Sequence, residues 1–310
     1  MSLRVVFFGT PDFAVPSLSR LVTAGFSVPL VVTQPDRPVG RHSAPVPSAV
    51  ARAAAGLGLE IAKPESLRGN GELLHRLQEM APDVGVVVAY GRILPPELLA
   101  VPRQGFVNVH ASLLPRYRGA SPVAAALLAG DAETGVVTMR VVDELDAGPL
   151  YLERSVRVEE REDAPSLSGR LSRIGSELLV ETLEGLERGS LAPRPQEGPA
   201  TYCRPIRRED GEIDWTRPAG EIERRLRAFT PWPGVFTFAD GDRVKVLEAR
   251  PGPATERRPG ELWRDGDRVR VAAGEGTSLE LLRLQRAGRR VVSAAEFAKS
   301  LPPAGRLGQA

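Results

Sequence analysis

Residues 106–122 run Phe106-Val-Asn-Val-His-Ala-Ser-Leu-Leu-Pro-Arg-Tyr-Arg-Gly-Ala-Ser-Pro122. The first residues are aromatic and β-branched, which predicts the end of a buried strand. The prolines and the glycine that follow cannot continue a strand, so the chain must form a loop before a helix starts at Pro122. A strand that opens into such a loop is typical of the sites at the carboxyl edge of open α/β sheets.

Two polar side chains, those of Asn108 and His110, lie two residues apart on this predicted strand and therefore leave the same face. An isolated Asn-x-His pair more often ties down backbone near a sheet edge than carries chemistry. The chain has only three histidines, however, and a second loop at residues 143–149 brings Asp146 after another predicted strand. An amide, an imidazole and a carboxylate that meet can transfer protons and stabilise an oxyanion, so these residues are candidate catalytic groups.

The first half of the chain alternates strand and helix patterns. Residues 3–8 and 84–89 are short apolar runs of the kind found in parallel strands that are buried on both faces, and residues 167–186 have helical spacing. We therefore expect an α/β fold with a mostly parallel sheet. Gly9 stands without the further glycines of a dinucleotide-binding turn, so a nicotinamide cofactor is not expected.

Two loops of this half are candidate binding loops. Residues 34–48 contain four prolines and are basic through Arg37, Arg41 and His42, which fits either an exposed connector or a functional lid. The loop that follows the strand at 84–89 would lie beside the Asn108 strand. Its Gly91 permits close approach of a flat ligand, although a plain strand-to-helix turn explains it equally well.

The composition changes after residue 189. Residues 190–207 are rich in proline, which predicts a semi-rigid linker, and the short strands that follow predict a small β-barrel. We therefore expect domains at 1–189 and 208–310. The second domain carries two arginine clusters, which either hold an RNA backbone or form a solvated charged face: Arg224, Arg225, Arg227, and Arg283, Arg286, Arg289, Arg290.

Overall composition is that of a globular protein, with 42% hydrophobic and 26% charged residues in a chain of 310. The net charge of +2 does not by itself indicate a nucleic-acid partner. The single cysteine, Cys203, excludes an internal disulfide and favours a reducing, cytoplasmic location. We expect neither a signal peptide nor a membrane span, since no apolar run approaches about 18 residues.

Several motifs together resemble the formyltransferases that use 10-formyltetrahydrofolate: Asn108-Val-His110, Ser112-Leu-Leu-Pro115, Arg118-Gly119 and Leu145-Asp146-Ala-Gly148. Further matches extend the resemblance over the whole chain, to those members that formylate an aminoacylated tRNA. They are Phe8-Gly-Thr-Pro-Asp-Phe13, Gln34-Pro-Asp-Arg-Pro-Val-Gly-Arg41, Gly130-Asp-Ala-Glu-Thr-Gly135, Ile213-Asp-Trp215, Arg227-Ala-Phe-Thr-Pro-Trp-Pro-Gly234 and Gly305-Arg-Leu307.

The resemblance implies a Rossmann-like folate-binding domain at 1–189 and an OB-like barrel at 208–310 that helps to hold methionyl initiator tRNA. It places Asn108, His110 and Asp146 on the family's catalytic positions, and Arg37 and Arg41 on a loop that reaches the tRNA acceptor arm. It implies a monomer with 10-formyltetrahydrofolate as co-substrate and no metal. The implied folate contacts are Tyr90, Gly91, Ile93, Ser112, Leu113, Leu114, Pro115, Asp143 and Leu145.

Other functions share parts of this pattern. A formyltransferase for a sugar-nucleotide amine, or a hydrolase that frees formate, would use the same three polar residues. The long loop at 34–48 argues against a small acceptor, which needs no such reach. An RNA-binding protein without catalysis would need the barrel but not the three polar residues.

Overall fold

The computed structural model describes residues 3–38, 44–299 and 305–308. They divide into two compact units, which we describe separately. The first unit contains the described residues up to 122 together with 133–157 and 168–204. The second contains 123–132, 158–167 and the described residues from 205 onward.

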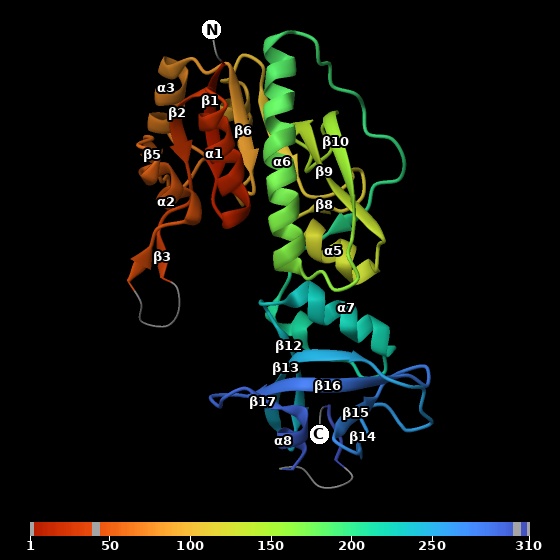
Figure 1. Cartoon of the computed structure of the whole chain (residues 1–310). Helices are drawn as coiled ribbons and strands as arrows, with labels where there is room; N and C mark the ends of the chain where they lie inside the picture. Colours follow the sequence, from red (N-terminus) through yellow and green to blue (C-terminus); the bar gives the residue numbers. More distant parts are fainter. Residues whose placement is uncertain (1–2, 39–43, 300–304, 309–310) are drawn as a thin grey trace. The chain divides into compact units, whose positions relative to one another are not determined.

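A seven-stranded sheet forms the centre of the first unit (Figure 1), with the order β10-β9-β7-β6-β1-β2-β5. The five strands from β7 to β5 run parallel, whereas β9 runs antiparallel to both β7 and β10. This confirms the predicted α/β fold with a mostly parallel sheet. The strands are β1 (Arg4–Gly9), β2 (Ser27–Val32), β5 (Ile61–Ala62), β6 (Val84–Val88), β7 (Phe106–His110), β9 (Glu133–Arg140) and β10 (Leu150–Arg157).

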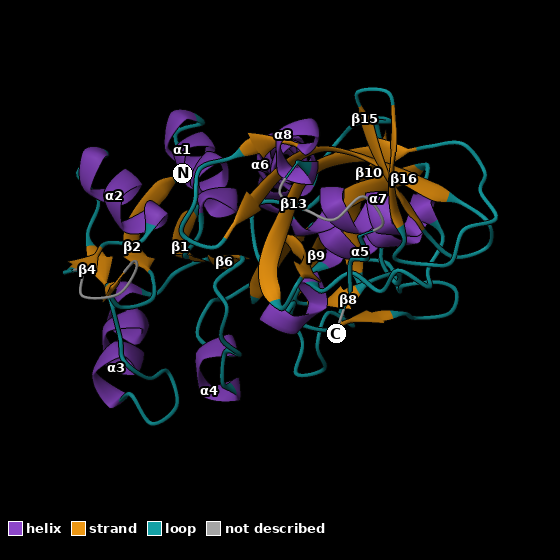
Figure 2. Ribbon diagram, turned by 90° about the horizontal axis from the view of Figure 1, so that it is seen from below, coloured by secondary structure: helices purple, strands orange, loops and turns teal. Residues whose placement is uncertain are grey.

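Helices cover both faces of the sheet, with α1 and α2 on one side and α3 and α4 on the other (Figure 2). The helix starts follow from capping: the Ser48 and Asn70 side chains accept hydrogen bonds from the first turns of α2 and α3. The helices up to residue 187 are α1 (Val15–Thr23), α2 (Ala49–Gly56), α3 (Gly71–Met80), α4 (Pro96–Leu99), α5 (Pro122–Ala129) and α6 (Ala164–Glu187), with a 3-10 turn η1 (Asp12–Ala14).

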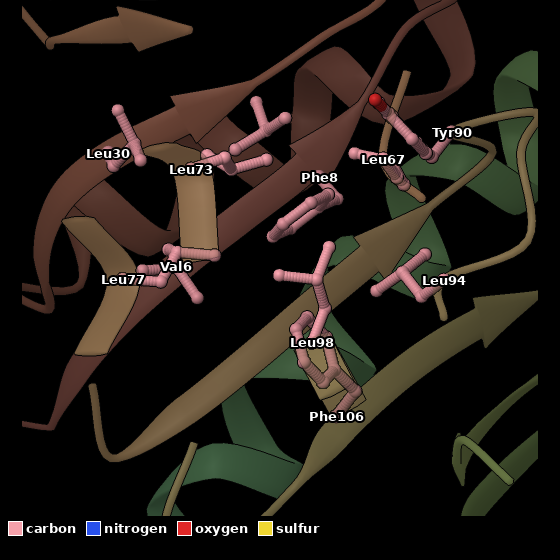
Figure 3. Close-up of a cluster of buried hydrophobic side chains, with 11 residues drawn as sticks. Val6, Phe8, Leu30, Leu67, Leu73, Leu77, Tyr90, Leu94, Leu98 and Phe106 are labelled. Carbon is pink, nitrogen blue, oxygen red and sulfur yellow. The ribbon is translucent and has the colours of Figure 1, made fainter. Parts of the chain in front are cut away.

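An aromatic cluster between the sheet and α3/α4 determines how β6 and β7 lie against β1 (Figure 3). The Phe8 ring makes edge-to-face contacts with Tyr90 and Phe106, at centroid distances of 5.4 and 5.5 Å. Such pairs contribute about 0.5–1.5 kcal/mol each beyond their area burial. The Phe106 ring also lies over Gly85, where a Cβ would come within 2.2 Å of it. This packing holds β6 and β7 side by side, with Gly85 opposite Phe106.

The second unit consists mainly of an antiparallel sheet of order β12-β13-β16-β15-β14, with β17 on the edge of β16. Helix α7 packs on β13, and the short α8 packs on β15 and β16. This sheet is the predicted C-terminal β domain. Its elements are η2 (Arg208–Gly211), α7 (Ala219–Phe229), β12 (Val235–Ala239), β13 (Asp242–Pro251), β14 (Leu262–Asp265), β15 (Arg268–Ala272), β16 (Ser278–Arg286), β17 (Val292–Ser293) and α8 (Ala294–Ala298).

Residues 190–204, which the sequence predicts as linker, lie in the first unit. Two backbone hydrogen bonds join Leu150 and Arg194, at 2.7 and 2.8 Å. Farther along, β11 (Tyr202–Cys203) pairs in parallel with β8 (Arg118–Gly119). The proline pattern predicts a semi-rigid linker here, and these backbone partners come from distant loops that no local pattern reveals. Among the described helices, none has the length and apolarity needed to cross a membrane.

Candidate active site

His110 is the last residue of β7, and its side chain is only 6% exposed. Its Nε2 lies 3.0 Å from the backbone carbonyl oxygen of Tyr117. A carbonyl oxygen can only accept a hydrogen bond, so Nε2 carries the proton of the neutral ring. Nδ1 is then the nitrogen that can take up a proton.

Asp146 faces that second nitrogen, with its Oδ2 3.7 Å from Nδ1. The same oxygen accepts a hydrogen bond of 2.8 Å from the backbone N–H of Gly119. The 3.7 Å separation exceeds hydrogen-bond length, so the two groups interact through charge and a small movement would join or part them. The predicted meeting of imidazole and carboxylate is therefore present in the structure.

Asp146 does not reach His110 simply because two parallel strands end at the same edge of the sheet. Because β9 runs antiparallel, Arg140 at its end pairs with Val107 at the start of β7. The loop 141–149 must therefore turn back along β7 to reach His110. At Gly148 a Cβ would lie 1.7 Å from the carbonyl oxygen of Arg140, so only glycine fits this return.

Burial lowers the pKa of His110 below its usual value of about 6.5. The Asp146 carboxylate and the hydrogen bond to Tyr117 act in the opposite direction but offset the burial only in part. The imidazole is therefore neutral at physiological pH, with Nδ1 ready to accept a proton. This is the protonation state that a general base requires.

Asn108 lies two residues before His110 on β7, between Val87 of β6 and Met139 of β9. It is half-buried, and its amide makes no hydrogen bond with any residue that the structure describes. Its side chain leaves β7 on the same face as the imidazole. A neutral donor is thus available beside the proton acceptor.

The loop after β6 contains three of the predicted folate contacts. The Tyr90 side chain points into the core of the unit (Figure 3), while its carbonyl oxygen accepts hydrogen bonds from Thr10 and Gln34. Gly91 has φ +82°, a conformation that glycine adopts easily. Ile93, at 82%, is the most exposed large apolar side chain of the described residues, so it is free to contact a ligand.

The predicted folate contacts after β7 mainly build the loop itself. Ser112 donates to the Arg116 carbonyl oxygen at 2.6 Å, and Leu114 is buried in a small apolar cluster. Leu113 packs over Gly135, and the Pro115 carbonyl oxygen accepts from Thr201 N–H. In the loop 141–149, by contrast, Asp143 and Leu145 are exposed.

The predicted tRNA contacts lie on a loop that the structure describes only in part. Arg37 is exposed in the small hairpin of β3 (Arg37–Pro38) and β4 (Pro45–Val46). Arg41 lies outside the described residues.

Five arginines of the two C-terminal clusters interact within their own unit. Arg224 and Arg227 donate to the carbonyl oxygens of Leu128 and Glu162, and Arg225 donates to that of Asp210. Arg286 and Arg290 form ion pairs with Asp242 and Glu296. Only the remaining two, Arg283 and Arg289, have exposed side chains without an ion pair to a described residue.

Sequence reasoning missed three residues of the predicted linker. The Gln196 amide donates to the carbonyl oxygens of Asp146 and Gly148, and Thr201 Oγ1 accepts from Tyr117 N–H. The Cys203 thiol lies 3.4 Å from the Tyr117 carbonyl oxygen. No sequence signal indicated them, because their partners are 48 to 86 residues away. Among the described residues, no His, Cys, Asp or Glu cluster is arranged to hold a metal.

Two family models match the chain: "Formyl transferase" over residues 3–183 and "Formyl transferase, C-terminal domain" over residues 205–302. The chain belongs to the formyl transferase family. Within that family it is similar to proteins named "Methionyl-tRNA formyltransferase". One from Thermus thermophilus is 47% identical over 99% of this chain and 100% of that protein. Another, from Koribacter versatilis, is 46% identical over 96% of each.

Solved structures with low identity share the fold. The sugar 3N-formyl transferase WlaRD, solved with dTDP and 5-N-formyl-THF, superposes with a TM-score of 0.68 at 14% identity, over 94% of this chain and 100% of that chain. HypX from Aquifex aeolicus, in complex with tetrahydrofolic acid, gives a TM-score of 0.62 at 18% identity, over 97% of this chain and 48% of that chain.

Proposed function

We propose that this chain transfers the formyl group of 10-formyltetrahydrofolate to the α-amino group of methionyl initiator tRNA. The observation that supports it most strongly is the placement of His110 Nδ1 3.7 Å from Asp146 Oδ2, with Asn108 on the same face of β7. Relatives of that name at 46–47% identity over nearly the whole chain support the choice of acceptor.

A folate co-substrate fits the residues around this site. Ile93 and Leu145 expose large apolar side chains, at 82% and 55%, on the two loops that flank β7. They could cover the faces of a flat ring, and the turn at Gly91 exposes backbone that can hydrogen-bond to its edge. When bound, 10-formyltetrahydrofolate supplies a formyl group whose oxygen gains negative charge as the amine attacks.

Asn108 would donate its amide N–H to that oxygen. A neutral donor already in place stabilises charge that develops during the reaction without first having to turn toward it. The absence of a competing partner among the described residues leaves the Asn108 amide free for this task.

His110 would take the proton from the attacking amine on Nδ1. The carbonyl oxygen of Tyr117 holds the ring in the required tautomer through Nε2, and the Asp146 carboxylate stabilises the imidazolium that results. His110, alone or through Asp146 and water, can then return the proton to the leaving nitrogen.

We assign folate binding and catalysis to residues 1–189, with 190–207 as connection, and tRNA binding to residues 208–310 together with Arg37 and Arg41. Unpaired, exposed cations in the second unit support a contact with phosphate, since such contacts need charge that is not already neutralised. We also propose that the protein acts in the cytoplasm as a monomer.

The test offers 10-formyltetrahydrofolate with one of three acceptors: charged initiator tRNA, a sugar-nucleotide amine, or water alone. We expect formylmethionyl-tRNA as the dominant product, detected by mass spectrometry after ester hydrolysis. Preferred formylation of the sugar amine would point to the first alternative function, and formate release at the same rate without an acceptor would point to a hydrolase. Either result would refute the proposal.

A further inference from the structure

The side chain of Gln196, which lies outside the predicted site, binds the turn that carries Asp146. Nε2 of Gln196 donates to the carbonyl oxygens of both Asp146 and Gly148, each at 2.8 Å. Asp146 itself has φ +50°, a left-handed conformation that a non-glycine residue keeps only when its surroundings hold it there. The two hydrogen bonds hold the backbone at Asp146 itself and two residues after it, and so stabilise that conformation; we call this arrangement the clamp.

The orientation of the Gln196 amide follows from its partners. Its oxygen accepts from Nε and Nη2 of Arg118, at 3.2 and 2.9 Å. A guanidinium can only donate and a carbonyl oxygen can only accept, so the reversed amide would lose all four interactions. Gln196 therefore has one orientation, in which both amide hydrogens face the Asp146 turn.

Arg118 extends the clamp to the other end of the loop. Its Nη1 lies 3.1 Å from the Glu144 carboxylate and 3.3 Å from the Tyr202 hydroxyl. The adjacent Gly119 N–H binds the Asp146 carboxylate directly. The backbone of Gln196 is also held near this loop, because Arg194, two residues before it, forms the backbone bridge with Leu150.

We propose that Gln196 is a positioning residue that holds the Asp146 carboxylate against His110. The 3.7 Å gap between Oδ2 and Nδ1 is set by the backbone of a loop that returns along an antiparallel strand, and Gln196 is the side chain that ties this backbone down. The assignment rests on the proposed function only for its catalytic consequence, since the geometry concerns the free protein.

The test follows the His110 imidazole by NMR over a pH titration. The chain has three histidines, so the His110 signal is assigned by its loss in His110→Ala. Gln196→Met keeps the length of the side chain and removes its donors. We expect the His110 pKa to fall in this variant, because a displaced carboxylate favours the imidazolium less. The variant also removes the two hydrogen bonds of Arg118 to the Gln196 oxygen, whereas the Tyr117 carbonyl oxygen on Nε2 and the Cys203 thiol beside it do not depend on Gln196.

A double-variant cycle tests whether Gln196 acts through Asp146. Asp146→Asn alone should also lower the His110 pKa, and adding Gln196→Met should then change nothing further. Gln78→Glu, on the exposed face of α3, is the control and should titrate as the wild type does. If Gln196→Met does not fold, Gln196→Asn keeps the amide but shortens its reach by one methylene.

An unchanged His110 pKa in a folded Gln196 variant would overturn the proposal, as would an equal shift in the Asp146→Asn background. In the transfer assay, we expect Gln196→Met to lower kcat about 10-fold to 100-fold, as misplaced catalytic groups do. If the wild type transfers no formyl group, the proposed function fails, and the titration still decides the role of Gln196.

Discussion

The carbonyl oxygen of Tyr117 lies 3.0 Å from Nε2 of His110, and Tyr117 itself has a left-handed backbone with φ +59°. A bulky residue in that conformation is uncommon and needs support from its neighbours. The support comes from Thr201 and Cys203, which contact the Tyr117 backbone on its N–H and carbonyl sides. The tautomer of the His110 imidazole thus depends on residues that lie 84 and 86 positions away from Tyr117 along the chain.

Replacing any one of the three polar residues should abolish most of the activity. We expect Asn108→Ala, His110→Ala and Asp146→Ala each to lower kcat by about 100-fold or more, because each removes a proton-transfer or charge-stabilising group. Steady-state formyl transfer measures the loss, and circular dichroism checks the fold. His75→Ala, at an exposed position of α3, is the control and should keep full activity. Near-normal turnover in one of the three variants would remove that residue from the mechanism.

The pH profile should reflect the buried imidazole. Because burial lowers the pKa of His110 below about 6.5, its neutral form persists into mildly acidic solution. A neutral general base is the active form, so the part of the kcat/KM profile that depends on His110 should rise with pH through this lowered pKa and be complete by neutrality. In Asp146→Asn the residual activity should show this rise at still lower pH, since the carboxylate that favours the imidazolium is gone. A midpoint above about 6.5 that His110 controls would contradict the assignment.

Gly148→Ala should disrupt the return of the loop to His110. The added Cβ would overlap the carbonyl oxygen of Arg140, so the backbone must shift at a cost of about 1–3 kcal/mol. Urea unfolding measures the loss, and kcat should fall with it. Gly169→Ala, within α6, meets no atom closer than 3.9 Å and should stabilise by about 0.5–1 kcal/mol. Equal stabilities of the two variants would argue against this account of the loop.

Ile93→Ser should weaken folate binding without lowering stability. The side chain is 82% exposed, so it contributes little to the core, and surface substitutions usually change stability by less than about 0.5 kcal/mol. We expect KM for 10-formyltetrahydrofolate to rise about 10-fold, since burying such a side chain against a ligand contributes roughly 1.5–3 kcal/mol. Leu57→Ser, at another exposed apolar position, should leave KM unchanged.

Substitutions of arginines in the second unit should affect either the stability of the protein or its binding of tRNA. Arg225 donates to the carbonyl oxygens of Asp210 and Glu212, so Arg225→Met should lower the free energy of unfolding by about 1–3 kcal/mol. Arg283 is exposed and unpaired within the described part of the chain, so Arg283→Gln should leave stability unchanged. If Arg283 contacts phosphate, the variant should bind tRNA more weakly and reduce the salt dependence of log K by about one. A loss of stability in Arg283→Gln, together with unchanged stability in Arg225→Met, would contradict this division into structural and tRNA-binding arginines.

Local patterns predicted much of this protein. Periodicity along β7 and the breakers after it located the strand end that carries Asn108 and His110, because those signals depend only on neighbouring residues. The apolar runs likewise predicted the mostly parallel sheet, and the short strands after residue 208 predicted the C-terminal β domain. The side-chain directions of Tyr90 and Leu114, both in the core, could not be read in this way.

The sequence by itself determined which groups we propose for the chemistry, because an amide, an imidazole and a carboxylate are chemical identities that no fold can alter. Only the tertiary structure decided how they meet. The turn of loop 141–149 back along an antiparallel strand, the clamp by Gln196 and the tautomer of His110 all depend on hydrogen bonds to backbone groups from distant parts of the chain. Every residue except proline carries the same backbone donor and acceptor, so their partners exist only once the chain has folded.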